Sequence, residues 1–227
     1  MKGTTVLVCA LSCLGMVAFS GCSRGPSERP LSQAEIQEVA KFFGGNTDFT
    51  CTQTHDTAGH DYPPMTLAFS EGKWRHEMPY SVAPITIVRP DRKTAYKFWP
   101  PVKVIEEYRL PEGGKMPILH LVKEKSDIGS ETINGHPCVK CRVVTQEDEG
   151  MVEWTTWEAT DMNRFPIRAE YLEGPKTVRL EFSNIVLTKP DPSLFEPPKG
   201  YKKFTNERDA ANYMFRKWQE LGDRQAK

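Results

Sequence analysis

The sequence lacks an excess of charge of either sign. Its 227 residues include 30 Lys and Arg against 30 Asp and Glu, so the formal net charge is zero. A protein that neutralises many phosphates needs a basic surplus, so this balance argues against a dedicated nucleic-acid-binding protein. Hydrophobic residues make up 38% of the chain and charged residues 26%, which is typical of a folded globular protein.

Motifs for catalysis and nucleotide binding are also lacking. The sequence contains no G-x-G-x-x-G, no P-loop and no nucleophile elbow. Its spacing indicates no pairing of a nucleophile with a base. We therefore expect a protein that is not an enzyme and that needs no cofactor.

Long apolar runs are rare, and the longest lies near the N-terminus. It covers Val6–Phe19 after the basic Lys2, and it is shorter than the ~20 residues of a transmembrane helix. This pattern predicts a secretory signal peptide over residues 1–21.

The end of this segment resembles a bacterial lipobox. The residues F-S-G-C end at Cys22, with Phe in place of the more usual Leu. The resemblance implies that Cys22 carries palmitate-type acyl chains and that the polar residues 22–31 form a tether. Because Ser23 is not Asp, analogy with enteric sorting favours the outer membrane, facing the periplasm. The alternative is ordinary secretion without a lipid on Cys22.

Three cysteines follow the predicted signal and lipobox. In an oxidising compartment we expect a structural disulfide from Cys51 to Cys138 or Cys141. The C-x-x-C spacing of the last two is that of a redox site, but their flanks predict a strand, on which residues three apart face opposite sides. A functional thiol stays as the alternative.

The periodicity predicts a helix, then a long series of strands, then a second helix. Ser32 and Glu35 form a capping box for the first helix, and Gly44 and Gly45 end it. The terminal helix covers 205–221, with Gly222 closing it. Residues 116–122 are ambiguous between helix and strand. The expected strands are Asp48–His55, Met65–Phe69, Lys73–Met78, Ile85–Arg89, Thr94–Trp99, Lys103–Leu110, Cys138–Val144, Val152–Ala159, Ile167–Leu172 and Thr177–Leu187.

These strands favour an antiparallel meander, because no helical pattern alternates with them. Val178, Leu180 and Phe182 share one face of their strand and polar residues share the other, so one face is buried and one is wet. Trp154 and Trp157 lie three apart, so we expect them on opposite faces, with at least one exposed or at a pocket rim.

The order of several motifs resembles the LolA/LolB-like superfamily of periplasmic lipoprotein carriers and receptors. A helix precedes the strand Asp48–Gln53, a K-x-R strand follows at Lys73–Arg75, and D-x-x-L-F-x-x-P-x-G stands at Asp191–Gly200. The resemblance covers residues 32–204. It implies an α+β fold, mostly antiparallel, with an incomplete, half-open barrel whose concave face is covered by helices, and N- and C-terminal helices. Residues 205–227 form a helical extension.

In carriers of this superfamily an apolar hollow accepts acyl chains. The resemblance implies a pocket lined by aromatic and aliphatic side chains, or the same side chains in a filled core. One departure argues against shuttling. Carriers have an Arg just before the K-x-R strand, and the segment Ser70–Lys73 contains none. Arg75 lies nearby within the strand, but we expect it on the face opposite to that of the carriers' Arg. The candidate lining residues are Phe49, Leu67, Phe69, Trp74, Ile85, Ile87, Phe98, Trp157, Leu180 and Phe182.

Three functions stay open. The first is an anchored binding module for lipid or lipoprotein acyl chains, with the membrane as its partner through the anchor. The second is an envelope interaction or sensor scaffold with a filled core. The third is a thiol or metal protein, whose metal would sit at His55-Asp56 and His60-Asp61. A polar hairpin loop explains those residues more simply, so we expect no metal, and the sequence names no protein partner.

Overall fold

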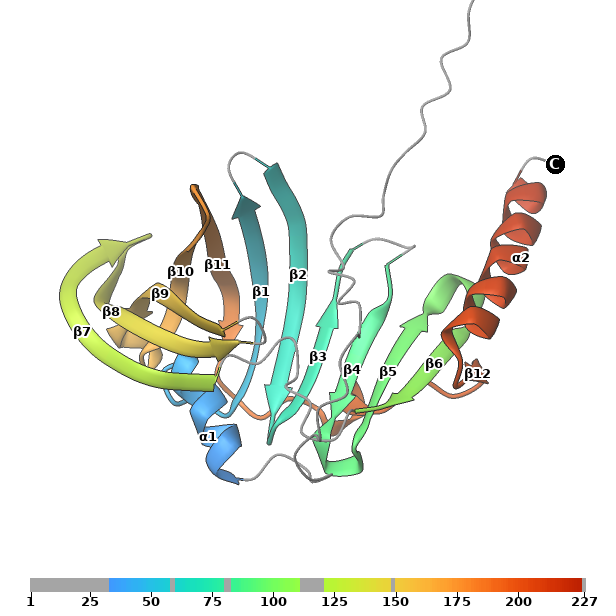
Figure 1. Cartoon of the computed structure of the whole chain (residues 1–227), viewed down its shortest axis with the longest axis horizontal. Helices are drawn as coiled ribbons and strands as arrows, with labels where there is room; N and C mark the ends of the chain where they lie inside the picture. Colours follow the sequence, from blue (N-terminus) through green and yellow to red (C-terminus); the bar gives the residue numbers. More distant parts are fainter. Residues whose placement is uncertain (1–32, 58–59, 80–82, 111–120, 148–149, 226–227) are drawn as a thin grey trace, which may run out of the picture.

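The computed structural model describes residues 33–57, 60–79, 83–110, 121–147 and 150–225 (Figure 1). The predicted signal peptide, Cys22, the tether and the capping residue Ser32 lie outside these residues. So does most of the ambiguous segment 116–122. The described residues form one curved sheet and two α-helices.

The sheet contains twelve strands, in the order β12-β6-β5-β4-β3-β2-β1-β11-β10-β9-β8-β7. Neighbours pair antiparallel except β12, which pairs parallel with β6. The two edge strands do not pair with each other, so the sheet stays open, and the expected incomplete barrel is confirmed. The strands are β1 (Asp48–Thr57), β2 (His60–Ser70), β3 (Lys73–Glu77), β4 (Ile85–Arg89), β5 (Thr94–Trp99), β6 (Val104–Arg109), β7 (Leu121–Ile133), β8 (His136–Glu147), β9 (Gly150–Ala159), β10 (Phe165–Glu173), β11 (Lys176–Val186) and β12 (Lys202–Phe204).

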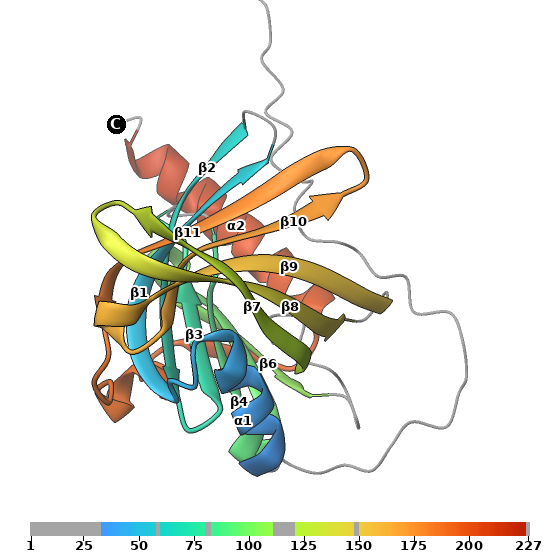
Figure 2. The same ribbon diagram turned by 90° about the vertical axis from the view of Figure 1, so that its left-hand side faces the viewer.

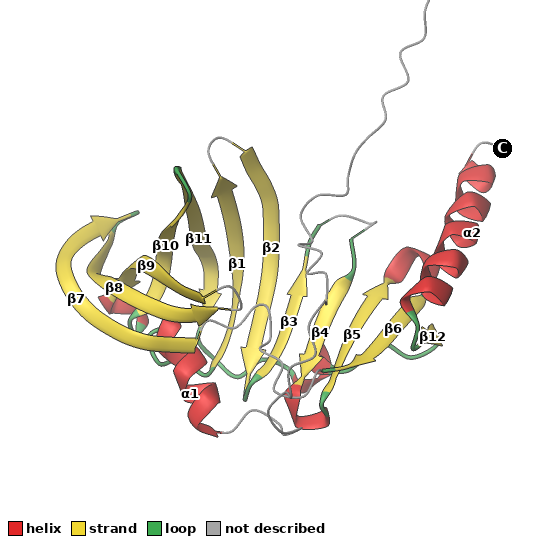
Figure 3. Cartoon of the chain, in the orientation of Figure 1, coloured by secondary structure: helices red, strands yellow, loops and turns green. Residues whose placement is uncertain are grey.

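The two α-helices lie at different ends of the sheet (Figures 1 and 2). Helix α1 (Gln33–Phe42) contacts β7, and helix α2 (Glu207–Gln225) contacts β6 and β12. We call the face that α1 covers the inner face and the opposite face the outer face. Figure 3 colours helices red and strands yellow. The short 3-10 turns η1 (Pro90–Arg92), η2 (Pro100–Val102), η3 (Thr160–Met162) and η4 (Pro192–Phe195) lie between strands. Neither α-helix of the described chain is long and apolar enough to cross a bilayer.

Helix α1 ends where the sequence predicts, at the glycine pair. Gly44 has φ of +67°, and a Cβ there would stand 1.9 Å from the backbone oxygen of Arg164. Any side chain at this position would collide with the backbone at the start of β10, so only glycine fits here. The prediction that Gly222 closes the terminal helix is wrong, because α2 continues through it to Gln225.

The predicted strands all exist, and two further strands were not predicted. Edge strand β7 lacks the alternation of a half-buried strand, since most of its middle residues, from Lys123 to Thr132, are exposed or nearly so. Bulges between Val122 and Glu124 and between Asp127 and Gly129 interrupt its pairing with β8. Charged side chains and bulges are ordinary means of keeping an edge from pairing with other chains, and they also remove the sequence signal.

Candidate functional site

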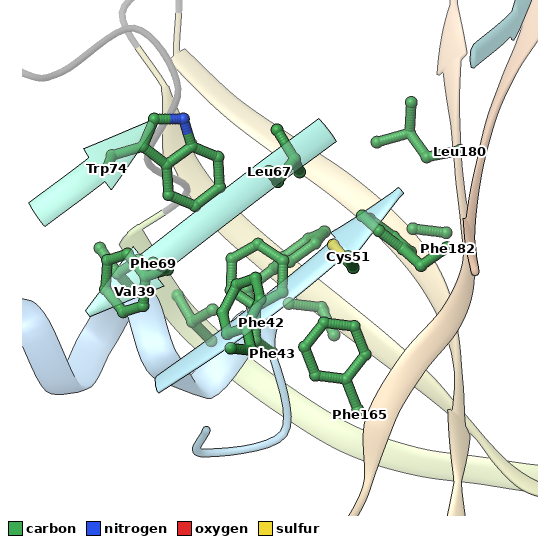
Figure 4. Packing of buried hydrophobic residues seen from close by; sticks show 14 of the residues in the cluster. Val39, Phe42, Phe43, Cys51, Leu67, Phe69, Trp74, Phe165, Leu180 and Phe182 are labelled. Atoms are coloured by element: carbon green, nitrogen blue, oxygen red, sulfur yellow. The ribbon is translucent and has the colours of Figure 1, made fainter. Parts of the chain in front are cut away.

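The inner face carries the largest apolar cluster of the molecule, which we call the inner cluster. Phe42 and Phe43 of α1 reach into it, and the ring of Phe43 lies 4.7 Å from Phe49 and 6.0 Å from Trp74, centre to centre (Figure 4). Phe165 of β10 lies 5.7 Å from the same ring. Six of the predicted lining residues belong to this cluster: Phe49, Leu67, Phe69, Trp74, Leu180 and Phe182.

Three other predicted lining residues face away from it. Ile85, Ile87 and Phe98 belong to a second cluster on the outer face, which we call the outer cluster, together with Phe195 of η4. Residues 192–201, which we call the strap, cover this cluster. The prediction placed them on the wrong face because every residue of β4 is buried, so its sequence shows no alternation that separates inside from outside.

Trp157 is also on the outer face, and its assignment to the inner lining is wrong. It belongs to a third cluster with Cys138 and Ile167, and its ring lies under Lys140 (5.0 Å) and Arg168 (5.7 Å). Trp154 belongs to the inner cluster, so the two tryptophans do face opposite sides. The expected exposure of one of them is wrong, because they are 4% and 6% exposed.

A row of polar side chains runs across the inner face beside the inner cluster. His76 pairs with Thr86, Thr86 with Lys97, and Lys97 with Glu106, each directly across neighbouring strands. We call these four residues the polar row. One pleat further along the same strands, Trp74, Val88, Ala95 and Tyr108 form the matching row, of which the first three are buried in the inner cluster. The inner face of β3–β6 therefore changes from apolar to polar within one pleat.

Two buried polar atoms at this boundary have no hydrogen-bond partner in the described chain. They are Nε1 of Trp74, a side chain only 2% exposed, and Nδ1 of His76. Leaving a buried donor or acceptor unpaired costs about 1–3 kcal/mol, so each such atom requires an explanation. In Figure 4 the indole nitrogen of Trp74 lies on the side of the ring away from Phe42 and Phe43.

Burial shifts the pKa of two residues of the polar row, His76 and Glu106, and of the neighbouring Tyr108. It lowers the pKa of His76 to about 4, with smaller effects of the Lys97 and Arg75 charges, so the imidazole is neutral at pH 7. Burial also raises the pKa of Glu106, against the charge of Lys97, and that of Tyr108. The Lys97 ammonium lies 5.5 Å from the centre of the Tyr108 ring.

The three cysteines of the described residues are free thiols, so the predicted disulfide is not formed. Strands β11, β10 and β9 separate β1, which carries Cys51, from β8, which carries the other two. Cys141 lies in the inner cluster and Cys138 lies in the third cluster, with Trp157 on the outer face, which confirms that they face opposite sides. Burial raises the pKa of Cys51 and Cys141 to about 12, and a thiol with such a pKa is a poor nucleophile.

The His and Asp pairs of the β1–β2 hairpin do not form a metal site within the described residues. His55 stacks on Tyr62 at 4.8 Å and shares a hydrogen bond with the hydroxyl of Thr57 (2.9 Å). The side chains of His60 and Asp61 lie outside the described part. No group of three potential metal ligands occurs in the part of the chain that was searched.

Arg75 lies on the opposite pleat from Trp74, as expected. It donates a hydrogen bond of 3.3 Å to the backbone oxygen of Leu194 in the strap, and it forms an ion pair with Glu77. The polar row was not recognised in the sequence. A signal for it exists, since His76 must share a face with Trp74 two residues before it, and Lys97 must share a face with Ala95.

No family model matches the sequence, and no curated protein matches it. Solved structures with a similar arrangement include MucB (13% identity, TM-score 0.44, 76% of this chain and 66% of that one). Others are LprF from Mycobacterium bovis (14%, 0.38, 74% and 99%) and a LolA superfamily protein from Nitrosomonas europaea (11%, 0.34, 73% and 97%). The chain thus spans slightly less than two thirds of MucB. At these TM-scores the likeness carries no information about ligand or partner.

Proposed function

We propose that this chain is a non-catalytic lipoprotein of the bacterial cell envelope that binds lipid or lipoprotein acyl chains on the inner face of its sheet. Residues 1–21 are the signal peptide, and acylated Cys22 with the tether 22–31 holds the protein at the outer membrane, facing the periplasm. The domain of residues 32–204 and the extension 205–227 are then exposed to the periplasm.

The observation that carries this proposal is the open sheet with an apolar inner face. Strands β7 and β12 end the sheet at opposite edges, and the inner cluster extends from α1 across β1, β2 and β3 to Val88 and Ala95. A curved sheet with an apolar inner face suits flexible apolar ligands, which need area rather than directed hydrogen bonds.

Metabolic labelling with an alkyne analogue of palmitate tests the anchor. We expect label on the protein and loss of the label in Cys22→Ser. Cys13→Ser, which changes a cysteine inside the predicted signal peptide, is the matched control and should keep the label. Label that persists in Cys22→Ser would contradict the lipobox.

Mass spectrometry of lipids that co-purify with Cys22→Ser tests the ligand. This variant lacks the acyl chains of the anchor, so any stoichiometric acyl chain found with it belongs to a binding site. About one acyl ligand per chain supports the proposal. A chain free of lipid supports the second candidate function.

The second candidate is an envelope interaction scaffold with a filled core. The filling of the inner face by α1 favours it, because Phe43 contacts the rings of Phe49, Trp74 and Phe165 at once. In that case the partner surface lies elsewhere, and Phe215 of α2, which is 64% exposed, is the first position to test by substitution with Ser in a pull-down.

A further inference from the structure

The polar row lies where an acyl chain on the inner face would end. Trp74 belongs to the inner cluster, and His76 stands two residues further along the same strand and face. Two such residues are about 7 Å apart along a strand. An amphiphile with its tail against the cluster would therefore place its headgroup over the row.

The two unpartnered atoms at this boundary can both serve an oxyanion. The indole nitrogen of Trp74 is a donor only, so its missing partner must be an acceptor. His76 is neutral at pH 7, and the tautomer with its proton on Nδ1 is a second donor. Both groups are buried, so water satisfies them less readily than it satisfies surface groups.

Lys97 supplies the positive charge. It stands two strands from His76 in the same row, about 10 Å away at the backbone, and its charge acts on the His76 ring. Within the described chain, Lys97 has no carboxylate within 4 Å, although Glu106 is its cross-strand neighbour; its one aromatic contact is Tyr108. An ammonium group placed beside a buried apolar surface without an ion pair is suited to an anionic ligand.

The remaining charged groups limit where the anion lies. Glu106 ends the row on the β6 side and repels a negative charge, while Thr86 stands between His76 and Lys97 with a hydroxyl that can donate. The favourable position is therefore over Thr86, between His76 and Lys97 and away from Glu106.

We propose that the polar row, with the indole N–H of Trp74, is a headgroup site for an acidic amphiphile, whose carboxylate or phosphate oxygens accept from Trp74, His76 and Lys97. This inference rests on the proposed function, since the tail would occupy the inner face. It adds that the ligand is recognised by a negatively charged head and not by its tail alone.

The test compares two ligands that differ in charge at the head. Full-length protein in dodecyl maltoside is titrated with 9,10-dibromostearate and with its uncharged methyl ester, and binding is followed by quenching of tryptophan fluorescence. We expect the acid to bind about tenfold more tightly than the ester, which corresponds to one charge-assisted hydrogen bond. Lys97→Met should remove this preference, and Glu106→Gln should increase it a few-fold.

Lys140→Met is the matched control. Lys140 also lies over an aromatic ring, that of Trp157, but on the outer face, so its loss should leave both affinities unchanged. Trp74→Phe keeps an aromatic side chain and removes the N–H, and it should weaken binding of the acid by about threefold to tenfold relative to the ester.

Each contrary outcome identifies what fails. If acid and ester bind equally, or Lys97→Met weakens both to the same extent, the headgroup site is overturned while the acyl-binding function stands. If neither ligand binds, both proposals fail. If inorganic phosphate alone binds as tightly as the acid, the site takes a small oxyanion and the lipid assignment is overturned.

Discussion

The two faces of strands β2–β6 bury apolar side chains in different ways. On the outer face, the outer cluster lies under the strap, and two backbone carbonyls of the strap accept hydrogen bonds. Arg75 donates to Leu194 and Arg89 donates to Phe195 (3.1 Å). Arg89 also pairs with Asp91 and Glu196. On the inner face, the inner cluster packs against α1, but Trp74 and His76 each keep a buried polar atom without a partner.

The two faces of one sheet therefore differ in how completely their buried polar groups are paired. On the outer face, each polar group that the strap brings to Arg75 and Arg89 forms a hydrogen bond. On the inner face, Nε1 of Trp74 and Nδ1 of His76 lack a hydrogen-bond partner within the described chain. Unsatisfied buried groups are disfavoured in folded proteins, so the two that persist on the inner face require an explanation.

The largest expected effect concerns the inner cluster. Phe43→Ala removes a ring that contacts at least three others, and it should lower the free energy of unfolding by ~3–5 kcal/mol. Phe215→Ala, at an exposed position of α2, should change it by less than ~0.5 kcal/mol. Urea denaturation of both variants measures the difference, and equal losses would show that α1 does not hold the inner face.

The pH dependence of His76 is the next largest effect. Its pKa is about 4 in the folded protein and near 6.5 in the unfolded chain, so between these values only the unfolded chain binds the proton. The stability that neutral His76 contributes is present above pH 6.5 and is lost as the pH falls towards 4, a total of about 3 kcal/mol. His76→Asn should abolish this component. An NMR titration with a His76 midpoint near 6.5 would contradict the burial of this ring.

The strap provides a smaller test on the outer face. Arg89 has a side chain only 6% exposed and holds two carboxylates and a carbonyl, so Arg89→Met should cost about 2 kcal/mol. Arg92→Met removes a second, half-exposed contact to Glu196 and should cost less than ~1 kcal/mol. Similar losses in the two variants would mean that Arg89 does not tie the strap to the sheet.

The smallest expected effect concerns Trp157, on the outer face where the strap does not reach. Lys140 and Arg168 lie over this ring instead. Lys140→Met should cost ~0.5–1 kcal/mol at low salt. A loss of stability as large as that of Arg89→Met would show that Lys140 stabilises the outer face at Trp157 as much as Arg89 does at the strap.

Much of the strand order could be predicted because it depends on local sequence. Ile85–Arg89 and Thr94–Trp99 have the predicted bounds, and each lies between turn residues. The face of each residue was predicted only where alternation is visible: Leu180 is inside as expected, whereas Ile87 and its neighbour Val88 are both buried, on opposite faces. The candidate site was missed because Lys97 stands between two aromatic residues, Tyr96 and Phe98, that are both buried on the outer face.

Composition, spacing and turn residues by themselves determined a largely antiparallel sheet protein whose first helix ends at a glycine pair, because hydrophobic periodicity and backbone geometry are short-range properties. Tertiary structure alone decided which face each apolar residue covers, that Cys51 stays apart from Cys138 and Cys141, and that His76 and Lys97 share one row. These outcomes depend on how distant strands pair and on what α1 and the strap cover, which no single stretch of sequence contains.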